Sequence, residues 1–191
     1  MMHFVLAKRL FVPILALGLF SIATTADAAI VILQANLDQE QERPIPIPPP
    51  AGILPPSGVA IMVYDTETNM FDLEVAANGI TEALDSVFPT LANSHIHLAP
   101  PGEPGGVIVP LGGPAVYSEP LPGFIRASFT GLMLDEQYED DLLANLTYVN
   151  IHTDRNSAGE IRGQLIVIPE PATMSILGLG SLALLARRRR A

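Results

Sequence analysis

The sequence contains neither cysteine nor tryptophan, and its only lysine, Lys8, lies near the N-terminus. Without cysteine the chain can form no disulfide bonds and has no thiolate to serve as a nucleophile or metal ligand. The fold must therefore depend on a hydrophobic core. Glycine and proline are frequent, with 15 and 18 residues respectively. This composition favours many turns over long helices.

Positive charge is scarce in the central part of the chain. Residues 29–168 contain 18 aspartates and glutamates against four arginines, which gives a net charge of −14. Such an acidic body repels the phosphates of nucleic acids, so we expect no nucleic-acid partner.

The first 28 residues have the pattern of a secretory signal peptide. Lys8 and Arg9 form a basic start, residues 10–22 are largely apolar, and Ala26-Asp27-Ala28 is a small-residue cleavage motif. The apolar run is short for a retained membrane anchor. We therefore predict export and cleavage by signal peptidase before Ala29.

The last 23 residues, 169–191, contain a second targeting pattern. Pro169, Glu170 and Pro171 precede a hydrophobic segment (173–186), and a basic tail follows, made of Arg187, Arg188, Arg189 and Arg190. Arginines behind an apolar segment hold a tail on the cytoplasmic side of the membrane. The segment is short for a stable span of about 20 residues. This suits a transient anchor in the inner membrane better than a permanent one.

This arrangement closely resembles the PEP-CTERM sorting signal of Gram-negative bacteria. The resemblance implies recognition by an exosortase, cleavage near the Pro-Glu-Pro, and a final location at the cell surface or outside the cell. It also implies an association with exopolysaccharide and biofilm production. An ordinary single-span tail anchor is the alternative interpretation.

Between the two targeting segments the pattern predicts strands separated by turns. Residues 44–56 hold seven prolines and form a stiff loop. One helix is expected over 135–145, with Asp135 as its cap. Short alternating or apolar runs mark the strands, which are 30–37, 59–64, 70–75, 95–98, 107–109, 124–131, 146–153 and 160–167. These elements predict an all-β fold, an antiparallel β-sandwich or barrel-like sheet with one short helix.

Three histidines stand out as candidate ligands. His95 and His97 share one face of a strand because successive side chains alternate, and His152 lies in another strand. Three imidazoles suit copper or zinc. The alternative is a metal-free cluster in which hydrogen bonds with Glu160 and Arg162 fix the strand register.

Other sites are weaker on the sequence alone. Asp154, Asn156 and Glu160 lie around a turn and offer oxygen ligands for calcium, but turns collect such residues anyway. Ser94 precedes His95, yet neighbours on a strand point apart, and Ser157 lacks the strand-to-helix elbow of a nucleophilic serine. We therefore do not expect an enzyme.

The central region resembles the CHRD domain, first noticed in chordin and widespread in bacteria. The resemblance rests on His95-Ile96-His97 with Pro100-Pro101-Gly102, on 142–153, and on 159–165, and it spans roughly 30–167. It implies a CHRD-type β-sandwich over 29–168 in an exported protein without an established enzyme activity.

Together these features predict an exported, surface-sorted structural or binding protein of the extracellular polysaccharide or biofilm matrix. The alternative is a copper- or zinc-binding extracytoplasmic protein that uses His95, His97 and His152.

Overall fold

The computed structural model of the chain describes residues 30–81 and 88–169. The predicted signal peptide (1–28) lies outside these residues, as do the hydrophobic segment (173–186) and the basic tail (187–190) of the sorting signal. Among the described residues, no helix is both long enough and apolar enough to cross a membrane.

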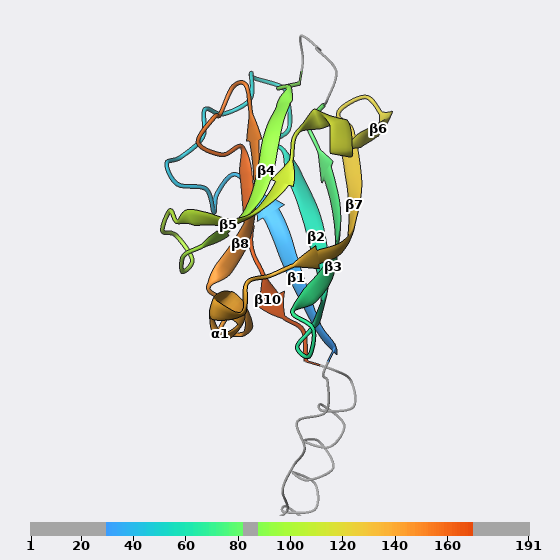
Figure 1. The fold of residues 1–191 in the computed structure, drawn as a ribbon. Helices are drawn as coiled ribbons and strands as arrows, with labels where there is room; N and C mark the ends of the chain where they lie inside the picture. The colour runs from blue at the N-terminus through green and yellow to red at the C-terminus, as the bar shows by residue number, and fades with distance from the viewer. Residues whose placement is uncertain (1–29, 82–87, 170–191) are drawn as a thin grey trace, which may run out of the picture.

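Antiparallel strands make up most of the described chain (Figure 1). The first five are β1 (Ile30–Asp38), β2 (Ser57–Asp65), β3 (Met70–Asn78), β4 (Leu91–Leu98) and β5 (Gly106–Gly112). The others are β6 (Ser118–Leu121), β7 (Phe124–Met133), β8 (Thr147–Thr153), β9 (Ile161–Gln164) and β10 (Ile166–Val167). The helical segments are η1 (Pro114–Val116), η2 (Glu136–Tyr138) and α1 (Glu139–Leu143).

The strands form one continuous sheet in the order β5-β4-β8-β9-β1-β2-β3-β7-β6, with β10 paired to β1. The sheet curls, so that its two halves face each other across the core (Figure 1). Tyr117 links these halves, because its ring packs against Phe129 of β7 and its hydroxyl donates to Ser94 of β4 at 2.9 Å. The predicted all-β antiparallel fold is thus confirmed, and its two layers are the halves of a single sheet.

The hairpin of β2 and β3 shows how the sequence pattern builds this sheet. Phe71, Leu73 and Val75 are buried in the core, whereas Asp72 and Glu74 between them face solvent, as the alternation predicts. The same period of two holds in β1 and β7.

The structure differs from the sequence prediction in three elements. The expected helix over 135–145 is a 3-10 turn followed by the five residues of α1, although Asp135 does cap it by accepting from the Gln137 amide. Between the expected strands 107–109 and 124–131, where no further element was predicted, the chain forms η1 and the short strand β6. The expected last strand is interrupted at Leu165, whose amide donates to Thr147 of β8.

Strand β8 is buried at every residue, which sets it apart from the other long strands. Its inward side chains Val149 and Ile151 belong to the core. Its outer side is covered in part by the proline-rich loop, which is held by Asn156: the Asn156 side chain accepts from the Ile47 amide and donates to the Ile47 carbonyl. The outer face of β4, β8 and β9 is consequently a polar surface that is shielded from water.

Candidate metal centre

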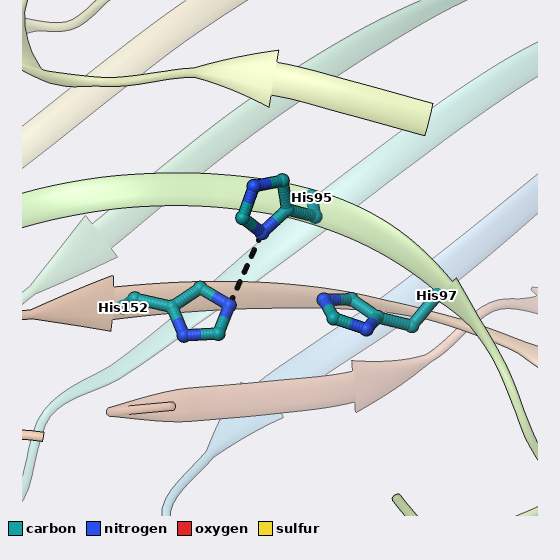
Figure 2. Close-up of side chains that lie close together, drawn as sticks. All are labelled: His95, His97 and His152. Atoms are coloured by element: carbon teal, nitrogen blue, oxygen red, sulfur yellow. Dashed lines mark hydrogen bonds between the residues drawn. The ribbon is translucent and has the colours of Figure 1, made fainter. Parts of the chain in front are cut away.

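The three histidines predicted from the sequence meet on this covered outer face. His95 and His97 flank the core residue Ile96 on β4, and His152 lies on the neighbouring strand β8. Figure 2 shows the three rings turned toward one another. One nitrogen from each ring lies within 4.8 Å of the other two, and among the described residues this is the group able to hold a metal ion.

Backbone carbonyls fix the tautomers of two of the rings. His97 Nδ1 lies 3.0 Å from the Gly105 carbonyl, and His152 Nδ1 lies 3.0 Å from the Ser157 carbonyl. Because a carbonyl oxygen can only accept a hydrogen bond, each Nδ1 must carry the hydrogen. In the neutral rings, the Nε2 atoms of His97 and His152 are therefore free to act as acceptors or as metal ligands.

The third ring, His95, is in direct contact with His152. His95 Nδ1 lies 3.2 Å from His152 Nε2, where it donates a hydrogen bond in the metal-free protein (Figure 2). His97 Nε2 is buried and has no hydrogen-bond partner among the described residues. The cluster therefore has three converging nitrogens. One of them, His97 Nε2, is a buried hydrogen-bond acceptor without a donor.

The environment keeps all three imidazoles neutral. Burial lowers the pKa of His95, of His97 and, most strongly, of His152, whose pKa falls to about 4. For His97, the electrostatic effects of the neighbouring His95 and Arg162 lower the pKa as well. Since metal ions bind the neutral ring, the site requires little loss of protons at pH 7 in order to take up a cation.

A stack of planar groups holds His97 in place. The Tyr148 ring lies parallel to His97 with their centroids 4.9 Å apart, and the Arg162 guanidinium lies 3.5 Å from the centroid of Tyr148. Arg162 also donates to the carbonyls of Pro100 and Glu103, and Tyr148 Oη accepts from the Gly105 amide. The stack therefore fixes the loop 100–105, whose Gly105 carbonyl orients His97.

The turn that orients His152 is held by a buried carboxylate. Glu160 accepts from Thr153 Oγ1 at 2.6 Å and from Asn156 Nδ2 at 2.8 Å. These bonds fix the β8–β9 turn, which presents the Ser157 carbonyl to His152. The expected direct bonds from Glu160 and Arg162 to the histidines are not formed. Glu160 and Arg162 instead act indirectly. Each holds a segment whose backbone carbonyl accepts a hydrogen bond from a histidine ring.

The other sites considered from the sequence do not assemble into a centre. The Asp154 Oδ1 atom accepts from the Thr90 amide, and the Asn156 Oδ1 atom accepts from the Ile47 amide. With both Glu160 oxygens also engaged, this turn has little capacity left for calcium. Ser94 is buried and bonds to Gly112 and Tyr117, on the opposite face of β4 from the histidines.

Sequence reasoning missed two residues of the site. Tyr148 had an available signal, because it shares the i, i+2 alternation with Asn150 and His152 on β8. Glu42 had no such signal, because it follows β1 in an irregular segment that is more than a hundred residues from β8. Only in the folded chain is it buried beside Gly159.

The comparisons with known proteins agree with this architecture. The model of the CHRD domain matches residues 33–165, well over half of the chain. The chain belongs to the CHRD family. A model of the PEP-CTERM protein-sorting motif matches residues 167–190 of this CHRD protein. No curated protein and no solved structure matches the chain significantly.

Both family resemblances noted in the sequence are thus confirmed. The PEP-CTERM motif is the signal read by an exosortase, so the CHRD protein is exported and handled by an exosortase at the cell envelope. The candidate metal centre lies within the CHRD match, since all three histidines fall between residues 33 and 165.

A buried carboxyl group beside this centre makes the stability of the CHRD domain depend on pH. Burial raises the pKa of Glu42 from 4.5 to about 7, against the opposing effect of the Arg43 amide and the Arg162 charge. Its Oε2 atom has no hydrogen-bond partner among the described residues, and a Cβ on Gly159 would collide with it. The folded protein therefore holds a proton on Glu42 that the unfolded chain releases near pH 4.5.

We predict that Glu42→Gln changes stability in a pH-dependent way. The raised pKa stabilises the fold below about pH 4.5, and this contribution is lost as the pH rises through about 7. Glutamine stays neutral at every pH. The variant should therefore gain in free energy of unfolding, relative to the wild type, between pH 5 and pH 8. Urea unfolding of both proteins at the two pH values measures this difference.

The matched control is Glu67→Gln, which removes the same charge from an exposed turn. A stability difference between Glu42→Gln and the wild type that is equal at both pH values would contradict the buried, protonated state of Glu42.

Proposed function

We propose that the exported CHRD domain is a non-enzymatic metal-binding module that holds one copper or zinc ion on His95, His97 and His152. The observation that carries this proposal is the convergence of three imidazole nitrogens within 4.8 Å of one another. Neutral imidazole is a preferred ligand of both metals, and three such ligands are a common set at zinc.

The spacing of the nitrogens supports a metal centre. Ligands at 2.0–2.1 Å in a tetrahedral site lie about 3.3 Å from each other. His95 Nδ1 and His152 Nε2 already stand 3.2 Å apart. A metal ion between them would replace the proton that they share and would also give the orphaned His97 Nε2 atom a partner. An unpartnered buried polar atom typically costs about 1–3 kcal/mol.

The ligand set also has the orienting contacts typical of metal-bound histidine. A histidine ligand usually donates from its second nitrogen to a carbonyl or carboxylate, which fixes the ring and its tautomer. The contacts of His97 with Gly105 and of His152 with Ser157 are of this kind. They exist without the metal, so the orientation and tautomer of these two rings are preorganised.

We predict that the purified protein binds one equivalent of Cu²⁺ or Zn²⁺, with copper the tighter as the usual order of divalent affinities requires. Loss of a group that only hydrogen-bonds to a metal ligand costs about 10–100-fold in metal affinity. His95→Ala, His97→Ala and His152→Ala should therefore each weaken binding by about 100-fold or more. Competitive titration against a chelator of known affinity measures this effect.

The control is Asp140→Asn, because an exposed acidic helix can also collect cations. This variant should keep full affinity and one-to-one stoichiometry. Absence of binding by the wild type, with the histidine variants only less stable, would leave the cluster as a structural hydrogen-bond network and overturn the proposal.

A second candidate function is association with extracellular polysaccharide after processing at the cell surface of a Gram-negative bacterium. The observation in its favour is an open groove beside β1 and β9 that is lined by both amide and apolar side chains, which are Gln34, Asn36, Gln41, Pro101, Gln164, Ile166 and Ile168. Amides can both donate to and accept from sugar hydroxyls. The net charge of −14 over residues 29–168 favours a neutral polymer.

We predict that the protein co-sediments with neutral polysaccharide isolated from the culture matrix. A double variant, Gln34→Ala with Asn36→Ala, removes the two β1 amides of the groove and should reduce the bound fraction several-fold. Thr130→Ala, an exposed polar change on β7, should leave the bound fraction unchanged. Equal sedimentation of the wild type with and without polymer would remove this candidate.

A further inference from the structure

An exposed aliphatic surface crosses the outer face of β1, β2 and β10, toward the end of the sheet at which β1 begins. In β1, Leu33 and Leu37 enter the core, whereas Ile30 and Ile32 point outward. The neighbouring strands continue the pattern. The residues of this surface, here called the apolar strip, are each 39–48% exposed; they are Ile30, Ile32, Ile61, Val63, Ile166 and Ile168.

Strand pairing makes the apolar strip continuous. Ile32 lies opposite Val63 on β2, and on its other side the Ile168 amide donates to the Ile32 carbonyl at 2.8 Å. One pair further along, Gln34 lies between Ile61 and Ile166. Single exposed aliphatic residues are normal on a protein surface, but a contiguous group of them marks a site of interaction.

The sorting signal begins at this surface. The motif match starts at Val167, and Ile168 of the apolar strip directly precedes Pro169-Glu170-Pro171. Only residues 169–172 separate Ile168 from the hydrophobic segment 173–186. Four residues reach at most about 14 Å when fully extended. Once the hydrophobic segment is in the membrane, the apolar strip cannot lie far from the bilayer surface.

We propose that the apolar strip docks on the lipid surface while the sorting segment anchors the chain, so that the domain lies with the outer face of β1, β2 and β10 on the bilayer. The proposal rests on membrane anchoring by residues 173–186 and is independent of the metal centre. Aliphatic burial at one small surface is weak by itself. The tether supplies a high local concentration, which makes a weak contact effective.

The charges around the apolar strip define the kind of lipid surface that it fits. Asp65 is the last residue of β2 and pairs with Ile30, and Glu67 lies in the turn that follows, so both carboxylates are at the same end of the sheet as Ile30. Asp72 and Glu74 line the adjacent outer face of β3. Anionic headgroups would be repelled by these carboxylates, whereas a zwitterionic surface would not. Docking should therefore weaken as anionic lipid is added.

Docking would also require cleavage of the sorting segment to precede sugar binding in the groove. The apolar strip shares Ile166 and Ile168 with the amide-lined groove. While the strip lies on the membrane, the groove is covered. A sugar chain would reach it only after cleavage releases the domain.

The absence of tryptophan from the chain allows a direct test with single reporters. Ile32→Trp and Ile166→Trp place the reporter in the apolar strip, and Leu121→Trp places it on β6 at the far edge of the sheet, where Leu121 is 66% exposed. The full chain is reconstituted in zwitterionic vesicles with brominated acyl chains. Both strip reporters should be quenched by the lipid and protected from aqueous iodide, with the opposite result for Leu121→Trp.

Replacing part of the zwitterionic lipid with anionic lipid should reduce the lipid quenching of both strip reporters. Iodide quenching of the strip reporters equal to that of Leu121→Trp would overturn the proposal, as would failure of the chain to float with the vesicles. Protection from both quenchers that increases with protein density would identify a second copy of the chain as the occupant, and would likewise overturn docking on lipid. Two strip reporters on different strands guard against a folding defect in one of them.

Discussion

The structure depends on one constraint, which is that the polar side chains on the outer face of β4, β8 and β9 are buried and must find partners. A buried polar group without a hydrogen bond is costly. The loop 100–105, the proline-rich loop and the β8–β9 turn cover this face and supply the partners, largely through backbone carbonyls and amides. Among the described residues, four buried side-chain atoms still lack a hydrogen-bond partner, and they are Glu42 Oε2, His97 Nε2, Thr147 Oγ1 and Asn150 Oδ1. Of these four, the His97 atom is the one that belongs to the histidine cluster.

Two layers of contacts connect this constraint to the proposed metal site. Arg162 and Glu160 fix the covering segments, and those segments fix the tautomers of His97 and His152. The site is therefore built from strands and held from outside by loops, an arrangement that suits a preorganised ligand set. The sorting signal indicates that the protein is exported, and the chain has no cysteine thiol that would compete with the imidazoles for copper or zinc.

Much of the fold could be predicted from the sequence because its strands follow a period of two, as in Phe71, Leu73 and Val75. The histidine cluster was predictable for the same reason, since i, i+2 spacing in a strand puts His95 and His97 on one face. Elements set by tertiary contacts were not predictable. Strand β6 depends on its pairing with β7, the break at Leu165 on a bond to Thr147, and the burial of Glu42 on the distant Gly159. Each of these partners is far away in the sequence or lacks a local pattern.

The most direct test of the account is X-ray absorption at the zinc edge of the zinc-loaded protein. The account predicts scattering from three imidazole rings, with zinc–nitrogen distances of about 2.0–2.1 Å, and loss of one ring's contribution in His97→Ala. A first shell made of oxygen atoms, with no imidazole scattering, would show that surface carboxylates hold the metal. The three histidines would then be a structural cluster, and the central claim would be wrong.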